Sequence, residues 1–218
     1  MLNKIYKNTV VTLTLTAAGL SAGTAVAAGD PVRGENLAQT CNGCHAGEGY
    51  RNPGPVYNIP KIGGQHADYI VTALKAYRSK ERSHGTMQAQ AASLSDQDMQ
   101  DIAAYYAAMN GNSKPILVNA ELAKLGKEKS ATCATCHGAT GNGDQPGFPK
   151  LAGQYDSYLV QALKDYRAAA QTQGKEGRNN AVMTGFASGL SIDDIEALAA
   201  WYASQEGDLS APRPKLFK

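Results

Sequence analysis

Large apolar side chains are scarce in this sequence. Of its 218 residues only three are Phe and one is Trp, and alanine supplies much of the 43% that is hydrophobic. Small domains bury a modest share of their surface, so a chain with few bulky side chains needs a staple or a bound group to complete its core. The composition therefore favours a large, flat apolar group inside the protein.

An excess of charge of either sign is also missing. Residues 1–27 carry two lysines and no acid, and without them 19 basic residues face 19 acidic ones. Split near residue 118, the first part holds eight residues of each sign and the second eleven. Nucleic-acid binding usually requires a basic excess, so we expect no nucleic-acid partner.

Long apolar runs are absent after residue 27, where nothing approaches the roughly 20 residues that cross a bilayer. The residues before that point have the layout of a secretory signal peptide, with Lys4 and Lys7, an apolar stretch over 10–20 and small residues up to Ala27. The stretch is short and broken by threonines, which favours cleavage over a membrane anchor. We expect residues 1–27 to be removed and the mature protein to work in the periplasm without a transmembrane segment; loose membrane association stays open.

A tandem repeat runs through the rest of the chain. Residues 30–110 can be laid over residues 120–206 so that the same features recur in the same order. The segment PKIGGQ from Pro60 matches PKLAGQ from Pro149, and LSDQD from Leu94 matches LSIDD from Leu190. We expect an N-terminal domain over 28–111, a linker over 112–118, a C-terminal domain over 119–206 and a solvated tail over 207–218.

Each repeat is predicted to be helical. A first helix, around 34–40 and 121–131, leads to a cysteine motif, and a last helix starts at a capping box, Ser95 with Asp98 and Ser191 with Asp194. The middle helix has apolar residues at positions i, i+4 and i+7. These are Ile70, Leu74, Tyr77 and Leu159, Leu163, Tyr166. No stretch alternates convincingly as a strand, so the expected fold class is all-α.

The motif C-x-x-C-H occurs twice in register, as CNGCH from Cys41 to His45 and CATCH from Cys133 to His137. Two thiols one helical turn apart can add to the two vinyl groups on one edge of a haem, and the histidine that follows can bind the iron. We expect two haem c groups, attached covalently through Cys41, Cys44, Cys133 and Cys136.

Other uses of four cysteines are less consistent with this pattern. Paired C-x-x-C clusters can bind zinc, and an exported protein can form two disulfides. Neither use requires a histidine directly after the second cysteine, and in both copies. A thioredoxin-like redox pair needs a strand and helix context that is missing.

The second axial iron ligand follows by elimination in the second repeat. That repeat has one methionine, Met183, and no histidine besides His137. Met183 lies seven residues before Leu190, and Met87 lies seven residues before Leu94. We therefore predict His45 and Met87 on one iron and His137 and Met183 on the other.

The remaining methionines and histidines are assigned to other roles. Met99 and Met109 have no methionine counterpart in the second repeat and are predicted to fill the core. His84 competes with Met87 as a ligand, but its counterpart is Asn180, so we predict a surface histidine. His66 is interpreted in the same way.

An iron with histidine and methionine on its two faces has no vacant position for a substrate, so the predicted activity is electron transfer and not catalysis. The proximal histidine also needs an acceptor for its other ring nitrogen. The backbone carbonyls of Pro60 and Pro149 are candidates, although either proline can instead serve only to shape its loop.

Taken together, these motifs resemble the dihaem cytochrome c4 family. The resemblance rests on the two C-x-x-C-H motifs, FPKLAGQ over 148–154 and DMQDIAAYY over 98–106, and it spans the mature chain. It implies two class I cytochrome c domains around a pseudo-twofold axis, each wrapped around one haem. It further implies a periplasmic carrier between a quinol-oxidising complex and a terminal oxidase. Residues 53–59 depart from the pattern and leave the loop near the first haem open.

The resemblance also implies that Gly34 and Gly126 let the first helix of each domain cross the last one closely, near Tyr105 and Trp201. The alternative function is the haem subunit of a flavocytochrome-type sulfide dehydrogenase, because such subunits resemble this family too. A dihaem peroxidase or thiosulfate-oxidising enzyme needs a displaceable ligand, against which the matched methionines argue.

Overall fold

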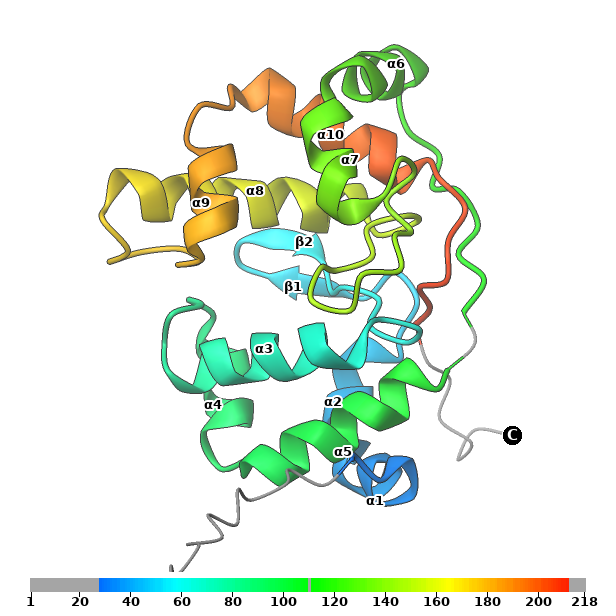
Figure 1. Ribbon diagram of the computed structural model, residues 1–218, viewed down its shortest axis with the longest axis vertical. Helices are drawn as coiled ribbons and strands as arrows, with labels where there is room; N and C mark the ends of the chain where they lie inside the picture. Colours follow the sequence, from blue (N-terminus) through cyan, green and yellow to red (C-terminus); the bar gives the residue numbers. More distant parts are fainter. Residues whose placement is uncertain (1–27, 110, 212–218) are drawn as a thin grey trace, which may run out of the picture.

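The computed structural model describes residues 28–109 and 111–211. It places the two sequence repeats in two helical bodies, one above the other (Figure 1). The predicted signal peptide and residues 212–218 of the predicted tail lie outside the described residues. In the part that is described, no helix is long and apolar enough to cross a membrane.

The first body combines helices with one small hairpin, and the second body is helical. In chain order the elements of the first are α1 (Pro31–Leu37), α2 (Gln39–His45), β1 (Arg51–Pro53), β2 (Val56–Asn58), α3 (Ala67–Arg78), α4 (Gly85–Ala92) and α5 (Asp96–Ala107). Those of the second are α6 (Ala120–Lys129), α7 (Ala131–His137), α8 (Asp156–Gln171), α9 (Ala181–Ala187) and α10 (Ile192–Ala203). The expected pair of helical tandem domains is confirmed.

Local sequence explains where these helices begin. The predicted capping boxes are confirmed at Ser95 of α5 and Ser191 of α10, where side chain and backbone exchange hydrogen bonds with the third helical residue. Asp30 and Asn119 cap α1 and α6, each accepting bonds from two backbone N–H groups. The two halves therefore start their first and last helices in the same way.

The first and last helices of each body cross at a glycine, as predicted. A Cβ added to Gly34 would lie 1.9 Å from the backbone oxygen of Asp101 and 2.9 Å from Tyr105 Cβ. A Cβ added to Gly126 would lie 1.9 Å from the backbone oxygen of Ala197 and 2.8 Å from Trp201 Cβ. Only glycine permits this close contact between backbones.

The middle-helix residues face inward. In α3, Ile70, Leu74 and Tyr77 are all buried in the core of the first body. In α8, Leu159 is buried, whereas Leu163 and Tyr166 are half-buried and line a cavity. The predicted helical face is therefore present in both bodies.

The expectation of no strand was wrong for the segment that departs from the family pattern. β1 and β2 pair antiparallel, with Asn52 opposite Tyr57. Tyr57 is buried, and at the end of β2 the Asn58 backbone N–H donates to Ser157 Oγ on α8 at 3.1 Å. A three-residue strand is too short to show a clear alternation in sequence, and this hairpin is stabilised by the opposite domain.

The described part of the C-terminal tail is packed and not solvated, contrary to expectation. Leu209 is fully buried, and Ser210 exchanges backbone hydrogen bonds with Gly63 of the first body. Gly207 pairs in the same way with Ser113 of the predicted linker. In Figure 1 this segment runs from α10 down to the first body. It thus ties the two domains together.

Replacing Gly34 with Ala should destabilise the protein by about 1–3 kcal/mol, because the added methyl group forces two helix backbones apart. Denaturant unfolding of the purified haem protein measures this change. Gly189→Ala is the matched control, since a Cβ there meets nothing within 4 Å and the residue lies outside both haem-attachment motifs. Equal midpoints for both variants would contradict the close-crossing account.

Candidate functional site

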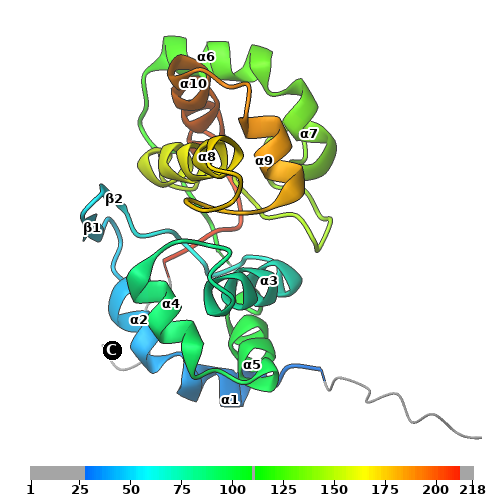
Figure 2. The same ribbon diagram turned by 90° about the vertical axis from the view of Figure 1, so that its left-hand side faces the viewer.

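One cavity of about 470 Å³ lies between the two bodies and is lined by both. In Figure 2, α8 lies above α3 at this boundary, and Figure 1 shows the β1–β2 hairpin between them in projection. The lining includes side chains from both C-x-x-C-H motifs and both predicted methionine ligands. These residues are Cys41, Cys44, His45, Met87, Cys133, His137 and Met183. Cys136 is on α7 together with Cys133 and His137, but it does not line the cavity.

The cysteines and the cavity fit the predicted haem groups. All four cysteines are free, so they form no disulfide. Within the described residues, no three or more His, Cys, Asp or Glu side chains are grouped so that they could hold a metal ion. Most lining side chains are aliphatic or aromatic. The arrangement suits a flat apolar group anchored at one edge.

Each motif histidine is oriented by a backbone carbonyl, as predicted. His45 Nδ1 donates to the oxygen of Pro60 at 2.9 Å, and His137 Nδ1 donates to the oxygen of Pro149 at 2.8 Å. Burial lowers the pKa of both imidazoles, which favours the neutral ring. A neutral ring with its proton on Nδ1 leaves Nε2 free to bind iron.

Each of these carbonyl-bearing loops is held by a glutamine of the opposite domain. Gln154 Oε1 accepts from the Lys61 N–H at 3.0 Å, and its Nε2 donates to the Lys61 oxygen at 2.9 Å. Gln65 makes the same two bonds to the backbone of Lys150, at 2.9 and 3.0 Å. Lys61 and Lys150 directly follow the two prolines, so each domain fixes the histidine acceptor of the other.

The two methionines occupy the first turns of matched short helices that were not predicted. The Met87 N–H in α4 donates to His84 Nδ1 at 3.3 Å, and the Met183 N–H in α9 donates to Asn180 Oδ1 at 3.0 Å. His84 is therefore a half-buried N-cap and not a surface residue. Its counterpart, Asn180, was a usable signal, because asparagine is a preferred N-cap.

The remaining predictions for histidine and methionine have mixed outcomes. Met99 is fully buried and Met109 packs against the same core, as predicted. His66 was expected at the surface, but it is half-buried and its Nε2 lies 2.8 Å from the Gly143 oxygen of the other domain. Its counterpart Tyr155 also reaches across, accepting a bond from the Gly49 N–H at 2.8 Å.

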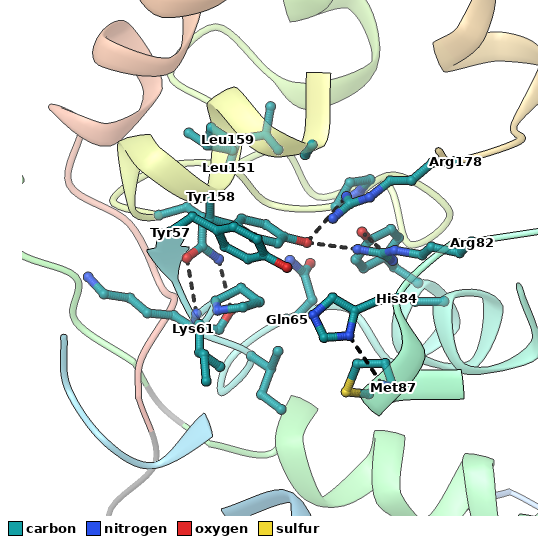
Figure 3. Close-up of a pocket in the computed structure, with 18 of the residues that line it drawn as sticks. Tyr57, Lys61, Gln65, Arg82, His84, Met87, Leu151, Tyr158, Leu159 and Arg178 are labelled. Carbon is teal, nitrogen blue, oxygen red and sulfur yellow. Dashed lines mark hydrogen bonds between the residues drawn. The ribbon is translucent and has the colours of Figure 1, made fainter. Parts of the chain in front are cut away.

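Two buried arginines at the cavity escaped the sequence analysis. Arg82 and Arg178 are 7% and 5% exposed, and Figure 3 shows both directed at the hydroxyl of Tyr158. They precede Met87 and Met183 by five residues each. That matched spacing is a usable signal in the sequence, whereas the balanced total charge gives no information about single positions.

Comparisons with known proteins agree with this geometry. The family model described as "Cytochrome c" matches residues 31–109 and 123–206. A cytochrome c4 from Pseudomonas aeruginosa is 34% identical over 208 residues, covering 92% of this chain and 98% of that protein. A crystal structure of reduced recombinant cytochrome c4 from Pseudomonas stutzeri matches with a TM-score of 0.68 at 30% identity, covering 82% of this chain and 100% of that one.

A second kind of relative is similar over a shorter stretch. A thiosulfate dehydrogenase electron acceptor from Stutzerimonas stutzeri is 30% identical over 177 residues, covering 77% of this chain and 79% of that protein. Both kinds of relative have names that place them in electron transfer.

Replacing Gln154 with Ala should alter the haem of the first domain. The haem of the second domain, to which Gln154 belongs, should be unchanged. Freeing the Lys61 backbone weakens the bond from His45 to Pro60, which makes the imidazole a poorer electron donor and raises the potential of the first domain's haem. NMR of the paramagnetic protein and spectroelectrochemistry resolve the two haems. Gln65→Ala is the mirror control and should act on the second haem. Effects confined to the domain that carries the substitution would refute the crossed arrangement.

Proposed function

Since the chain belongs to the cytochrome c4 family of c-type cytochromes, we propose that it carries electrons in the periplasm from a quinol-oxidising complex towards a terminal oxidase. It is an electron-transfer protein with two covalently bound haem c groups, and its partners are redox proteins. The route and the compartment are the proposed parts. They are supported by the signal-like residues 1–27 and by the similarity to cytochromes c4 over most of the chain.

The proposed haem attachment follows the motifs. Cys41 and Cys44 hold one haem through thioether bonds, and Cys133 and Cys136 hold the other. The proposed axial ligands are His45 with Met87 and His137 with Met183. The support is that the four ligand side chains line one cavity and that both histidines are oriented by a carbonyl.

The observation that carries the proposal is the continuity of this cavity across the domain boundary. Candidate ligands of both irons line the same cavity, so the two haem sites open into one space. With histidine on one face of each iron and methionine on the other, neither site offers a coordination position for a substrate. Such a pair of sites can pass electrons to each other and to a partner, but it has no open iron position at which to bind and convert a substrate.

Reconstitution with purified complexes tests the route. Addition of a quinol and a quinol-oxidising complex should reduce both haems, and addition of a terminal oxidase with oxygen should reoxidise them. Omitting the quinol-oxidising complex is the control for direct chemical reduction. If neither complex exchanges electrons with the protein at a useful rate, the proposed route is wrong while the haem sites stand.

A second candidate function is that of electron acceptor for a thiosulfate-oxidising enzyme. The observation that favours it is the 30% identity to the Stutzerimonas stutzeri protein of that role. Reduction by thiosulfate in the presence of a thiosulfate dehydrogenase, compared with reduction by the quinol-oxidising complex, separates the two. A sulfide-oxidising flavoprotein partner would instead be found by copurification of the flavoprotein from the native source.

The Met183 ligand assignment gives the sharpest test of the site. Met183→His should keep the second iron six-coordinate and lower its potential, because imidazole stabilises ferric iron better than a thioether does. Axial ligands move haem potentials over about 0.8 V in all, so the shift should be well resolved. Met183→Ala should open the site and let carbon monoxide bind the reduced haem.

The mirror variant Met87→Ala is the matched control and should open the first haem alone. Absorbance titration with carbon monoxide and the near-infrared band of methionine-ligated ferric haem report both changes. A Met183→Ala protein that keeps this band at full strength and binds no carbon monoxide would exclude Met183 as a ligand, and with it the repeat-based choice of Met87.

A further inference from the structure

The helix that carries Met183 has an apolar outer face. Val182 and Phe186 of α9 are 53% and 51% exposed, although both side chains are large and apolar. They are four residues apart and therefore share one face of the helix. Phe186 also lines the cavity, so this face borders the space that holds the candidate iron ligands. Val182 and Phe186 are called the α9 face below.

The first domain does not share this feature. The counterparts of Val182 and Phe186 are Thr86 and Gln90 on α4, which are exposed and polar. Gln90 lines the cavity, as Phe186 does. Since the two domains repeat the same helices around the same cavity, packing within a domain does not require apolar residues at these positions. Exposed apolar side chains that gather at one place mark an interaction site.

Charge is also arranged differently beside the two methionine helices. The segment 179–192 contains no acidic or basic residue, whereas the matched segment 83–96 ends at Asp96, which forms a salt bridge with Arg78. The counterpart of Asp96 is Ile192, which is 38% exposed. A third exposed apolar residue therefore follows the α9 face in sequence, at a position where the first domain has an acid.

The matched arginine of the second domain has no counter-ion. Arg167 donates to the Leu190 oxygen at 3.0 Å, and its counterpart Arg78 makes the equivalent bond in the first domain at 2.8 Å. Within the described residues no carboxylate forms a salt bridge with Arg167, and this includes Asp193, three residues after Leu190. A surface with apolar residues and such a cation is complementary to one with apolar residues and a carboxylate.

The size of the α9 face favours a partner that binds briefly. α9 has seven residues, so it is about 10 Å long. A stable interface buries roughly 800 Å² on each partner, and two side chains on so short a helix supply only a small part of that area. Weak electron-transfer complexes have the smallest interfaces. The α9 face therefore suits a transient redox partner better than a permanently bound second copy of this chain.

We propose that Val182 and Phe186 form the docking surface for a redox protein whose own surface is apolar at its centre and presents a carboxylate to Arg167. This inference rests on the proposed electron-carrier function and names the part of the molecule that meets the partner. Docking at α9 places the partner beside the helix that carries Met183. The first domain, which is polar at the matched positions, then exchanges electrons with the partner by way of the second.

The double substitution Val182→Thr and Phe186→Gln tests the docking surface, because it gives α9 the side chains of α4. Thr86→Ala with Gln90→Ala is the matched control on the first domain. Binding of each oxidised protein to the immobilised quinol-oxidising complex and to the immobilised terminal oxidase is measured by surface plasmon resonance. We expect the α9 variant to have an about tenfold higher dissociation constant for at least one complex, and the control to bind like the wild type.

Arg167→Gln, with Arg78→Gln as its control, tests the carboxylate of the partner. We expect Arg167→Gln to weaken binding to the same complex at low salt, and the difference from the wild type to shrink as salt is raised, because ions screen a charge pair at a surface. The loss caused by the α9 variant should persist at high salt, since apolar contact is not screened. Arg78→Gln should leave binding unchanged at every salt concentration.

Haem content and the near-infrared methionine band are measured first, since Phe186 lines the cavity. Should the double variant fail to assemble, Val182→Thr alone serves, because Val182 is exposed and does not line the cavity. Equal dissociation constants for wild type and α9 variant with both complexes would overturn the proposal, and so would a wild type that binds neither. A wild type that binds through α9 but exchanges no electrons would keep the docking surface and refute the route. Unchanged binding with normal electron exchange would do the reverse.

Discussion

The structure depends on the crossed bonds between each glutamine and the opposite loop. Gln65 satisfies both backbone groups of Lys150, and Gln154 satisfies both of Lys61, at distances of 2.9 to 3.0 Å. Separating the domains would exchange these four bonds for bonds to water, so each contributes about 0.5–1.5 kcal/mol net and together they stabilise the interface by a few kcal/mol. Because these loops also carry the acceptors for His45 and His137, the same bonds fix the interface and the geometry at each iron.

The tandem organisation, the capping boxes and the glycine crossings were predictable because they depend on local patterns that occur twice. Ser95 and Ser191 precede an acid by three residues, and Gly34 and Gly126 hold equivalent positions. Duplication acts as an internal check, since a feature that recurs at the same place in both halves is supported twice. For the same reason the acceptors of the histidines were predicted correctly at Pro60 and Pro149.

What the sequence could not show is mostly the contact between the halves. The bond from Asn58 to Ser157, the contact of His66 with Gly143 and the burial of Leu209 join residues that are far apart in the chain. Such contacts depend on how two folded bodies meet, and no local periodicity encodes that. His84 is a different case, because histidine is an uncommon helix cap and only the asparagine at its counterpart position indicates that role.

Charge shows the same limit of sequence counting. The mature chain is balanced, with 19 residues of each sign, yet the cavity between its domains is lined by six cations and, among the described residues, by no carboxylate. Three of these cations have a carboxylate beside them that does not itself line the cavity: Lys129 with Asp194, Lys150 with Asp208 and Arg178 with Asp165. Each haem contributes two carboxylates, and reduction adds one more negative charge at each iron. A cavity of cations opposes neither change, and its effect is largest where the dielectric is low. A neutral polypeptide can thus favour the reduced form of both haems by the placement of a few side chains.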